Sequence, residues 1–278
     1  MRSFIDDPRP ATADGDRADY LIGTMPSAGQ RRAHTVVLTM LGETGNDAAV
    51  SACTNLLRSY RSVRCLLMVG IAAGIPDPGR PERHVRLGDI VVARGIAEYD
   101  CVREKDDGQV PRRVFPPPSP LLARRARLLQ ASEMTGDRPW EDLLAAQVLL
   151  YPGFARPPES ADVMYSSQVP GSQVPHPDLA LSGHRPGQPK VHNGLIASGD
   201  RSLRSARKRD EIAACHDVLA IEMEGKGIGN TGFYEGVEWF AVRGISDYGD
   251  RHVTPTWRRY ASMAAAAYVR ALLEAEPG

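Results

Sequence analysis

The sequence predicts one α/β domain with a central, twisted, mixed β-sheet and helices on its faces. Short apolar runs typical of buried strands alternate along the chain with longer segments whose apolar residues recur at helical spacing. The length of 278 residues is sufficient for a single large domain with a sizeable core. We therefore expect one domain over residues 18–278, preceded by a short arm.

The composition excludes several classes of partner. Lysine plus arginine equals aspartate plus glutamate, at 34 each, so no net charge favours nucleic acid or an anionic membrane. No apolar run approaches the roughly 18 residues that a membrane span needs, and the polar opening segment does not resemble a secretory signal. The four cysteines are far apart and form no metal-binding motif. We expect a soluble, cytoplasmic protein without a metal or cofactor.

The first part of the chain predicts an arm, two strands and a helix. Residues 1–17 are rich in Asp, Pro and Gly without periodicity, which indicates a flexible arm. Residues 18–24 and 34–41 are expected to be strands, joined by a turn around Pro26 to Gln30. The glycine turn at residues 42–45 then leads into a helix, where free backbone N–H groups suit an anion or sugar oxygens. From the pattern alone, an ordinary strand-turn-helix connection is the favoured interpretation of this turn.

The next segments predict two central strands. Residues 65–69 form a continuous apolar run, as expected of a strand buried on both faces. The small residues after it, including Gly70 and Ala72, allow a ligand to approach the backbone closely. Gly88 and Asp89 form a turn before a strand at residues 90–93, and we interpret this turn as structural.

A proline-rich insertion follows at about residues 99–190. It contains two predicted helices, near residues 121–131 and 140–149. A lid over a binding site and a surface loop without a role in binding both remain open, since loops of this length are either functional or disordered. A strand at 191–197, a charged helix at 204–215 and a core helix at 257–273 are expected beyond it.

Acidic residues follow two of the apolar strands. Residues 218–221 lead into Glu222 and Glu224, and residues 240–242 lead through Arg243 to Asp247. Ligands of α/β proteins bind at the carboxyl ends of strands. Two differently tuned acids are sufficient for acid-assisted bond cleavage. Solvated acids, or ion pairs with nearby basic residues, are the alternative interpretation of the same pattern.

Several motifs, in the same order, resemble the purine nucleoside phosphorylase and nucleosidase superfamily. They are GETGNDAAVSACTNLLRSYRSVRCLLMVGIAAGIP, VRLGDIVVA, VHNGLIASGD, EMEGKG, VRGISDYGD and WRRYASMAAAAYVRALL, and they cover most of the chain. The version that the chain most resembles is the domain at the front of multidomain signalling and defence proteins. The resemblance implies a nucleoside phosphorylase-like three-layer fold, a purine nucleoside or nucleotide as small-molecule partner, and a homo-oligomer.

The resemblance also implies roles for individual residues. Asp247 would protonate N7 of the base, and Glu224 would accept hydrogen bonds from the ribose 2′- and 3′-hydroxyls. Ser246 would orient Asp247, and Met223 would pack against the sugar. The remaining residues implied at the pocket are Glu43, Gly70, Ala72, Gly199, Ser202, Glu222 and Arg243.

Two departures from the family pattern bear on the acceptor. Met68 and Ile71 stand where phosphorylases commonly carry an arginine and a serine, so water is favoured over phosphate. A strand ending in a water-positioning glutamate is usual in the family, and none precedes Asp19; either the start is trimmed or this acid is lacking. Glu43 is one candidate substitute. The predicted function is a purine nucleosidase of adenosine type; a phosphate-dependent phosphorylase and a non-catalytic nucleoside-binding module are the alternatives.

Overall fold

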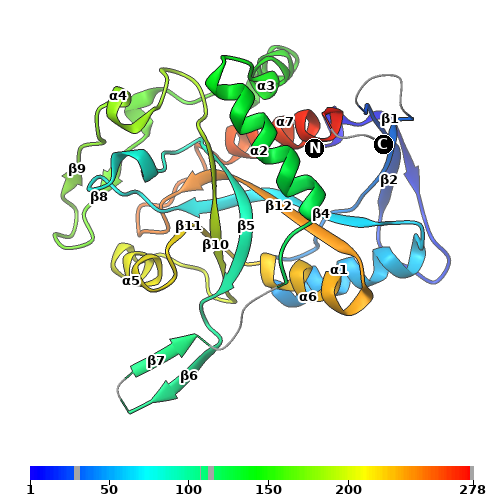
Figure 1. Cartoon of the computed structure of the whole chain (residues 1–278), viewed down its shortest axis with the longest axis horizontal. Coiled ribbons are helices and arrows are strands. Elements are labelled where there is room, and N and C mark those ends of the chain that lie inside the picture. Colours follow the sequence, from blue (N-terminus) through cyan, green and yellow to red (C-terminus); the bar gives the residue numbers. More distant parts are fainter. Residues whose placement is uncertain (28–31, 107, 112–115, 276–278) are drawn as a thin grey trace.

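Five strands of the predicted sheet close on themselves and form a barrel at the centre of the protein (Figure 1). A computed structural model of the chain describes residues 1–27, 32–106, 108–111 and 116–275. The order around the barrel is β10 (Val191–Ser198), β11 (Val218–Glu222), β4 (Cys65–Gly74), β12 (Glu238–Asp247) and β5 (Ile90–Glu98). The predicted α/β fold with a central mixed sheet flanked by helices is confirmed, and the sheet is in addition closed.

Strand directions within the barrel are mixed. β12 runs parallel to β4 from Glu238, opposite Cys65, to Asp247, opposite Ala73. β11 runs antiparallel to β4 and pairs with it only through residues 220–221 and 73–74. β4 was predicted to be buried on both faces, but Leu67 and Met68 are only half-buried, because a cavity opens along this strand.

Helices cover the barrel on opposite sides (Figure 1). The predicted core helix α7 (Arg258–Glu274) packs on β12 and β4, and its alanines at 264–267 are fully buried. The helices α1 (Asn46–Ser59) and α6 (Gly225–Glu235) pack against each other on the other side. α5 (Ala206–His216) packs against β11 and β10. In the described part of the chain, no helix has both the length and the apolar character needed to cross a bilayer.

The prediction of a flexible arm over residues 1–17 is wrong. A short 3-10 helix, η1 (Arg2–Phe4), precedes β1 (Asp6–Ala11), which pairs antiparallel with β2 (Tyr20–Met25). β2 in turn pairs with β3 (His34–Leu38), so these strands form a separate three-stranded sheet. Long-range contacts hold the segment, since the guanidinium of Arg270 on α7 donates to the carbonyl of Phe4 and lies 3.3 Å from the Asp6 carboxylate. Of the turn predicted around Pro26 to Gln30, residues 28–31 lie outside the described residues.

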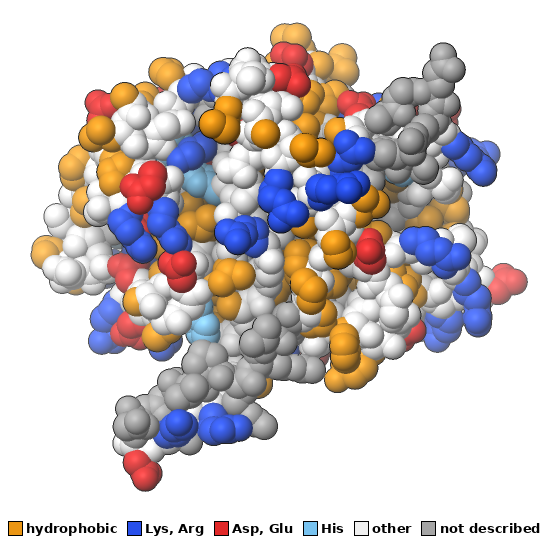
Figure 2. Space-filling view, in the orientation of Figure 1, with side chains coloured by type: hydrophobic (Ala, Val, Ile, Leu, Met, Phe, Trp, Pro, Cys, Tyr) orange, Lys and Arg blue, Asp and Glu red, His pale blue; other side chains and the backbone are white. Residues whose placement is uncertain are grey.

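The insertion at 99–190 contributes to the core. A hairpin of β6 (Val102–Lys105) and β7 (Gly108–Pro111) projects from the body (Figure 1), and the two predicted helices are α2 (Pro120–Met134) and α3 (Pro139–Leu150). On α3, Trp140 is 1% exposed and lies 5.4 Å, between ring centroids, from Tyr268 of α7. α2 buries Leu122, Ala126 and Leu129, while its outer face lies in the band of basic side chains in Figure 2. The remaining elements of the insertion are η3 (Pro152–Phe154), η4 (Glu159–Ala161), β8 (Met164–Tyr165), β9 (Gln173–Val174) and α4 (Leu179–Ser182), and η2 (Pro81–Arg83) lies before β5.

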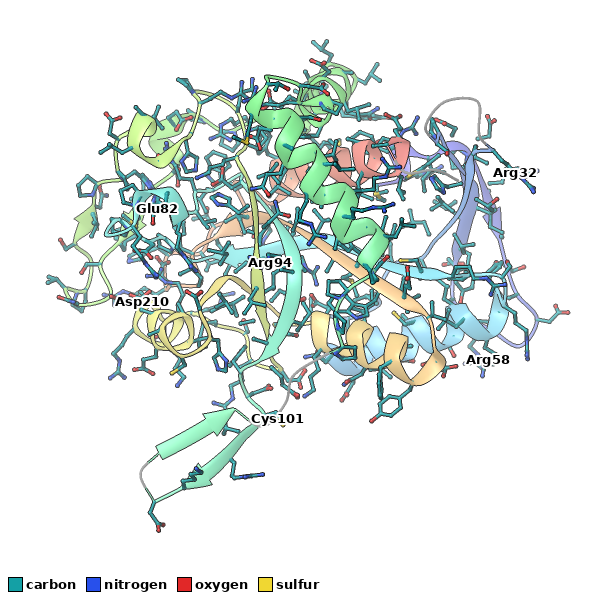
Figure 3. All side chains as sticks on the ribbon, in the orientation of Figure 1. Arg32, Arg58, Glu82, Arg94, Cys101 and Asp210 are labelled. Carbon is teal, nitrogen blue, oxygen red and sulfur yellow. The ribbon has the colours of Figure 1, made fainter. Side chains whose placement is uncertain are left out.

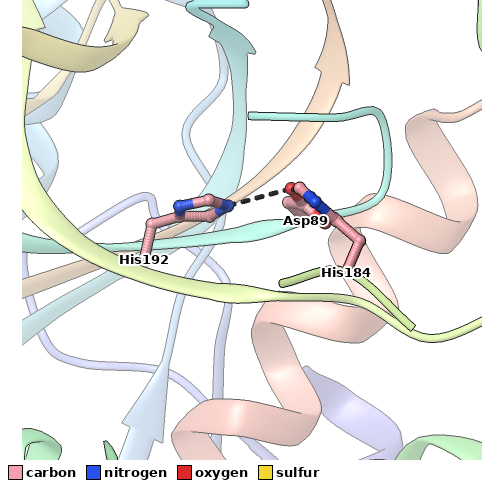
Figure 4. Close-up of side chains that lie close together, drawn as sticks. All are labelled: Asp89, His184 and His192. Atoms are coloured by element: carbon pink, nitrogen blue, oxygen red, sulfur yellow. Dashed lines mark hydrogen bonds and ion pairs between the residues drawn. The ribbon is translucent and has the colours of Figure 1, made fainter. Parts of the chain in front are cut away.

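A buried carboxylate ties the end of this insertion to the barrel. Oδ2 of Asp89, next to the start of β5, lies 2.8 Å from Nε2 of His184 and 2.9 Å from Nε2 of His192 (Figure 4). The backbone N–H groups of Arg86 and Lys190 donate to the same carboxylate. Burial alone would raise the pKa of Asp89, but the hydrogen bonds from the two histidines outweigh it and hold this pKa well below its usual range. These bonds support the structural role predicted for the turn.

One glycine on β12 sets how closely α7 can approach. A Cβ added at Gly244 would overlap the backbone carbonyl of Ala261, which cannot move without shifting the helix. We expect Gly244→Ala to lower the free energy of unfolding by about 3 kcal/mol, measured by urea denaturation. The control is Gly79→Ala, where the nearest atom is 3.7 Å away and a change within about 0.5 kcal/mol is expected. Equal stability of the two variants would contradict this close packing.

Candidate functional site

One cavity of about 1930 Å³ brings most of the predicted site residues together. It lies between the three-stranded sheet, α1 and the barrel strands β4, β11 and β12. Of the described residues, none from the insertion at 99–190 lines it. The predicted residues that line it are Glu43, Ala72, Ser202, Glu222, Met223, Glu224, Arg243, Ser246 and Asp247.

Strand register explains how the acids meet. On one edge of β4, Ala73 pairs with Ile221 of β11; on the other edge it pairs with Asp247 of β12. Glu222 follows Ile221 directly, so the acids of both strands reach the same level of the barrel. The sequence pattern suggested that two neighbouring strand ends deliver these acids to one cleft. In the structure β11 and β12 are separated by β4 and run in opposite directions.

Asp247 is held at the end of β12 by an irregularity in the strand. Ile245 pairs with Ala72 and Asp247 pairs with Ala73, so Ser246 is an extra residue in the ladder. Such bulges change the direction of the next side chain. The Ser246 hydroxyl donates to Oδ2 of Asp247 at 2.8 Å, and the Gly249 N–H donates to Oδ1 at 2.9 Å. The hydroxyl of Ser246 thus contacts the residue that it was predicted to orient.

Glu224 sits at the start of α6, in the wall of the same cavity. The N–H of Gly45, in the turn before α1, donates to its Oε1 at 3.2 Å, and Arg243 Nη2 donates to its Oε2 at 3.2 Å. Burial raises the pKa of the Glu224 carboxyl, although the nearby Arg243 charge opposes this effect. The predicted glycine turn thus contacts a site residue through a backbone N–H.

Glu222 and Arg243 form a buried ion pair beside Glu224. The Glu222 carboxylate accepts hydrogen bonds from the N–H groups of Glu224 and Gly225 and pairs with Arg243. Both side chains are almost fully buried, at 1% and 4% exposed. The oxygens of Glu222 are thus already engaged by Arg243 and by the backbone at the start of α6, and its predicted contact with the substrate stays a prediction.

Two predicted residues do not line the cavity. The space beside Gly70 is filled by the guanidinium of Arg243, which a Cβ there would overlap. Gly199 faces Tyr99 and the Asp100 carboxylate. Close approach does require glycine at both positions, but the neighbour is a protein side chain and not a ligand.

The sequence did not reveal the anchor of the α1 amino terminus. Asn46 is 2% exposed, and its side-chain Nδ2 donates to Asp200 Oδ1 at 2.8 Å. Its Oδ1 accepts from the N–H of Gly227 on α6 at 2.9 Å. Asp200 lies 154 residues away in the chain, so no local pattern indicated this contact.

The cavity also has basic residues that sequence reasoning missed. Arg201 and Arg204 follow β10, and Arg258 begins α7. All three are exposed, and within the described residues their side chains make no hydrogen bond or ion pair. Met68, predicted to replace a phosphate-binding arginine, also lines the cavity.

Fold and site together define a member of a known enzyme superfamily. A sequence model described as the Phosphorylase superfamily matches residues 15–274. The chain therefore belongs to the phosphorylase superfamily, as the motifs predicted.

Its relatives include nucleosidases. The chain is 28% identical, over 98% of its length, to a nucleotide-binding leucine-rich repeat (NLR)-like protein of Hyaloscypha variabilis, but it spans only 27% of that protein. It is 25% identical to the 5′-methylthioadenosine/S-adenosylhomocysteine nucleosidase of Mycobacterium bovis, covering 90% of this chain and 84% of that one. It is also 25% identical to the ATP nucleosidase Cap17 of Escherichia coli strain KTE188, over 84% of this chain and 40% of that one.

A solved structure shares the fold. The 5′-methylthioadenosine/S-adenosylhomocysteine nucleosidase of Neisseria meningitidis, in complex with methylthio-immucillin-A, superposes with a TM-score of 0.63 at 19% identity. The match covers 98% of this chain and 92% of that one.

Removing the positive charge of Arg243, which is paired with Glu222 and Glu224, should destabilise the protein in a pH-dependent way. In Arg243→Met the buried acids lose their counter-charge, and we expect the free energy of unfolding to fall by about 3–5 kcal/mol at pH 7.5. The raised pKa of Glu224 means that the folded state binds this proton more tightly than the unfolded chain does. Stability is therefore regained as the pH falls through the folded-state pKa.

The measurement is chemical denaturation at pH 7.5 and 5.5. Arg94→Met is the matched control, because Arg94 is an exposed residue on β5 (labelled in Figure 3). The stability loss in Arg243→Met, relative to wild type at the same pH, should be smaller at pH 5.5. A loss of the same size at both pH values would rule out the carboxylates as its cause.

Proposed function

We propose that the chain is a purine nucleosidase, which uses water to cleave the N-glycosidic bond of an adenosine-type substrate and releases the free base. The observation that carries the proposal is the shared cavity of Glu224 and Asp247. Nucleosidases among the relatives support it. The reaction needs one group that protonates the departing base and another that holds the ribose as positive charge develops.

The two acids suit these tasks for different reasons. Asp247 lies at a strand end, oriented by Ser246 and Gly249, where its carboxyl can donate a proton to N7 of the purine. Glu224, when ionised, accepts hydrogen bonds from the 2′- and 3′-hydroxyls and stabilises the oxocarbenium-like sugar. Met223, in the same wall, packs against the ribose.

Water is the acceptor that the lining favours. A phosphate acceptor requires cationic donors, and along β4 the cavity carries Met68 and Ile71 instead. Arg243, which lies beside Gly70, is already paired with Glu222 and Glu224. A phosphorylase would therefore lack its anion-binding group at this position.

The substrate class that the cavity favours is a purine nucleotide. The volume of about 1930 Å³ exceeds the roughly 300–1,000 Å³ typical of small-molecule sites. Arg201, Arg204 and Arg258 place three unpaired guanidinium groups on its lining, and guanidinium groups match phosphate oxygens. One relative is an ATP nucleosidase, which agrees with a 5′-phosphorylated substrate.

A substrate panel tests the proposal. The protein is incubated with adenosine, 5′-methylthioadenosine, AMP and ATP, with and without phosphate, and free base is measured by chromatography. We expect free adenine at a rate that phosphate does not change. Asp247→Asn keeps the shape but removes the acid, so turnover should fall by about 10²–10⁴-fold while binding persists. Ribose 1-phosphate as a product would identify a phosphorylase, and binding without base release would identify a non-catalytic module.

The arginines should discriminate nucleotides from nucleosides. In the double variant Arg204→Ala/Arg258→Ala we expect kcat/KM for ATP to fall by about 10–100-fold, because charged hydrogen bonds to phosphate are lost. The value for adenosine should change less than about threefold. Arg127→Ala, on the exposed face of α2, is the matched control. Equal losses for ATP and adenosine would exclude a 5′-phosphate site at these residues.

A further inference from the structure

The cavity contains five carboxylates, and their contacts divide them into two groups. Those of Glu222, Glu224 and Asp247 are engaged by backbone N–H groups, Arg243 or Ser246. Those of Asp19 and Glu43 make no side-chain hydrogen bond or ion pair with any described residue. A group that takes a proton from water needs free acceptor capacity, so the base for hydrolysis is sought among these two.

Glu43 is positioned next to the residue proposed to hold the ribose. It lies in the turn between β3 and α1, two residues before Gly45, whose N–H donates to Glu224 Oε1 at 3.2 Å. The following residue, Asn46, is buried and bonded to Asp200 and Gly227, so the end of this turn is fixed in place. The Glu43 side chain is itself exposed on the cavity lining and therefore in contact with water.

Asp19 lacks a comparable link to the site. It precedes β2, in the three-stranded sheet, and its carbonyl accepts a hydrogen bond from Thr39 Oγ1 at 3.0 Å. Among the described residues, no hydrogen bond or ion pair joins it to Glu224, Asp247 or their hydrogen-bond partners. Asp19 therefore serves as the matched control: an acid of the same cavity, equally unpaired, but attached to another element.

We infer that Glu43 is the general base that activates the attacking water, an inference that rests on the proposed nucleosidase activity. The water oxygen forms a bond to C1′ while the bond from C1′ to the purine nitrogen breaks and its electron pair stays on the base. Glu43 takes the proton that the water loses, and Asp247 gives a proton to the base. Exchange with solvent then returns both acids to their starting states, so no oxidant or further reactant is needed.

This assignment gives the cavity three acids with separate tasks. Asp247 acts on the base, Glu224 on the sugar hydroxyls and Glu43 on the nucleophile. A donor acid and an acceptor acid that serve opposite partners of one glycosidic bond are the general solution for its hydrolysis by water.

The first test compares Glu43→Gln with Asp19→Asn, using ATP and the release of adenine. Glutamine keeps the size of the side chain but cannot accept the proton. We expect kcat to fall by about 10²-fold or more, with KM changed less than about threefold. Asp19→Asn should stay within about twofold of wild type. Because Glu43 is exposed, the variant should fold normally, and circular dichroism with thermal unfolding checks this.

The second test separates base catalysis from a positional role. In Glu43→Ala the space left by the side chain admits formate, a small carboxylate that can accept the same proton. Added formate should restore part of the lost turnover in Glu43→Ala and leave wild type and Asp19→Asn unchanged. A positional role for Glu43 would give no rescue by formate.

The outcomes are distinguishable. Wild-type turnover together with full activity of Glu43→Gln, or a large loss in Asp19→Asn instead, overturns the assignment and leaves the nucleosidase proposal standing. Absence of base release by the wild type from every substrate overturns both. A loss confined to Glu43→Gln, together with formate rescue of Glu43→Ala, supports the assignment.

Discussion

The buried ion cluster of Arg243 with Glu222 and Glu224 is the interaction on which the site depends. Arg243 comes from β12, and both acids come from the end of β11 and the start of α6. Each charge is nearly or largely removed from water, so each needs the others and the backbone donors around them. The cluster also restricts the residue type at position 70, because only glycine there leaves room for the guanidinium of Arg243.

The cluster joins elements that the barrel alone would leave independent. β11 and β12 are not neighbours, since β4 lies between them. Their side chains meet because β4 presents Ala73 to both strands, and the extra residue Ser246 redirects Asp247. From the other side, the turn before α1 reaches Glu224 through the N–H of Gly45. Glu224 and Asp247, the acids proposed to act on the sugar and on the base, are thereby fixed relative to one framework.

Local patterns in the sequence predicted the five strands of the barrel and the helices α1, α2, α3, α5 and α7, but not α6. The family motifs singled out the pair Glu224 and Asp247. Other features of the fold and site depend on contacts between residues that are distant in the sequence, so local patterns could not predict them. Residues 1–17 have no periodicity, yet Arg270 holds them in an ordered segment. Glu222 has the same local signal as Glu224, and only the position of Arg243 shows that its oxygens are engaged. The arrangement of Asn46 with Asp200 likewise depends on closure of the barrel. The homo-oligomer implied by the family resemblance stays a prediction.

At Glu224, the stability of the unliganded protein conflicts with the proposed function of this residue. An acid partly stripped of water, with its pKa raised, weakens the unoccupied protein. Hydroxyl groups of a bound pentose would supply the hydrogen-bond donors that solvent no longer provides. Binding of the sugar would therefore reduce the cost of burying the Glu224 carboxylate. An apolar replacement of Glu224 would remove this destabilising charge, but under the proposed function it would also remove recognition of the sugar.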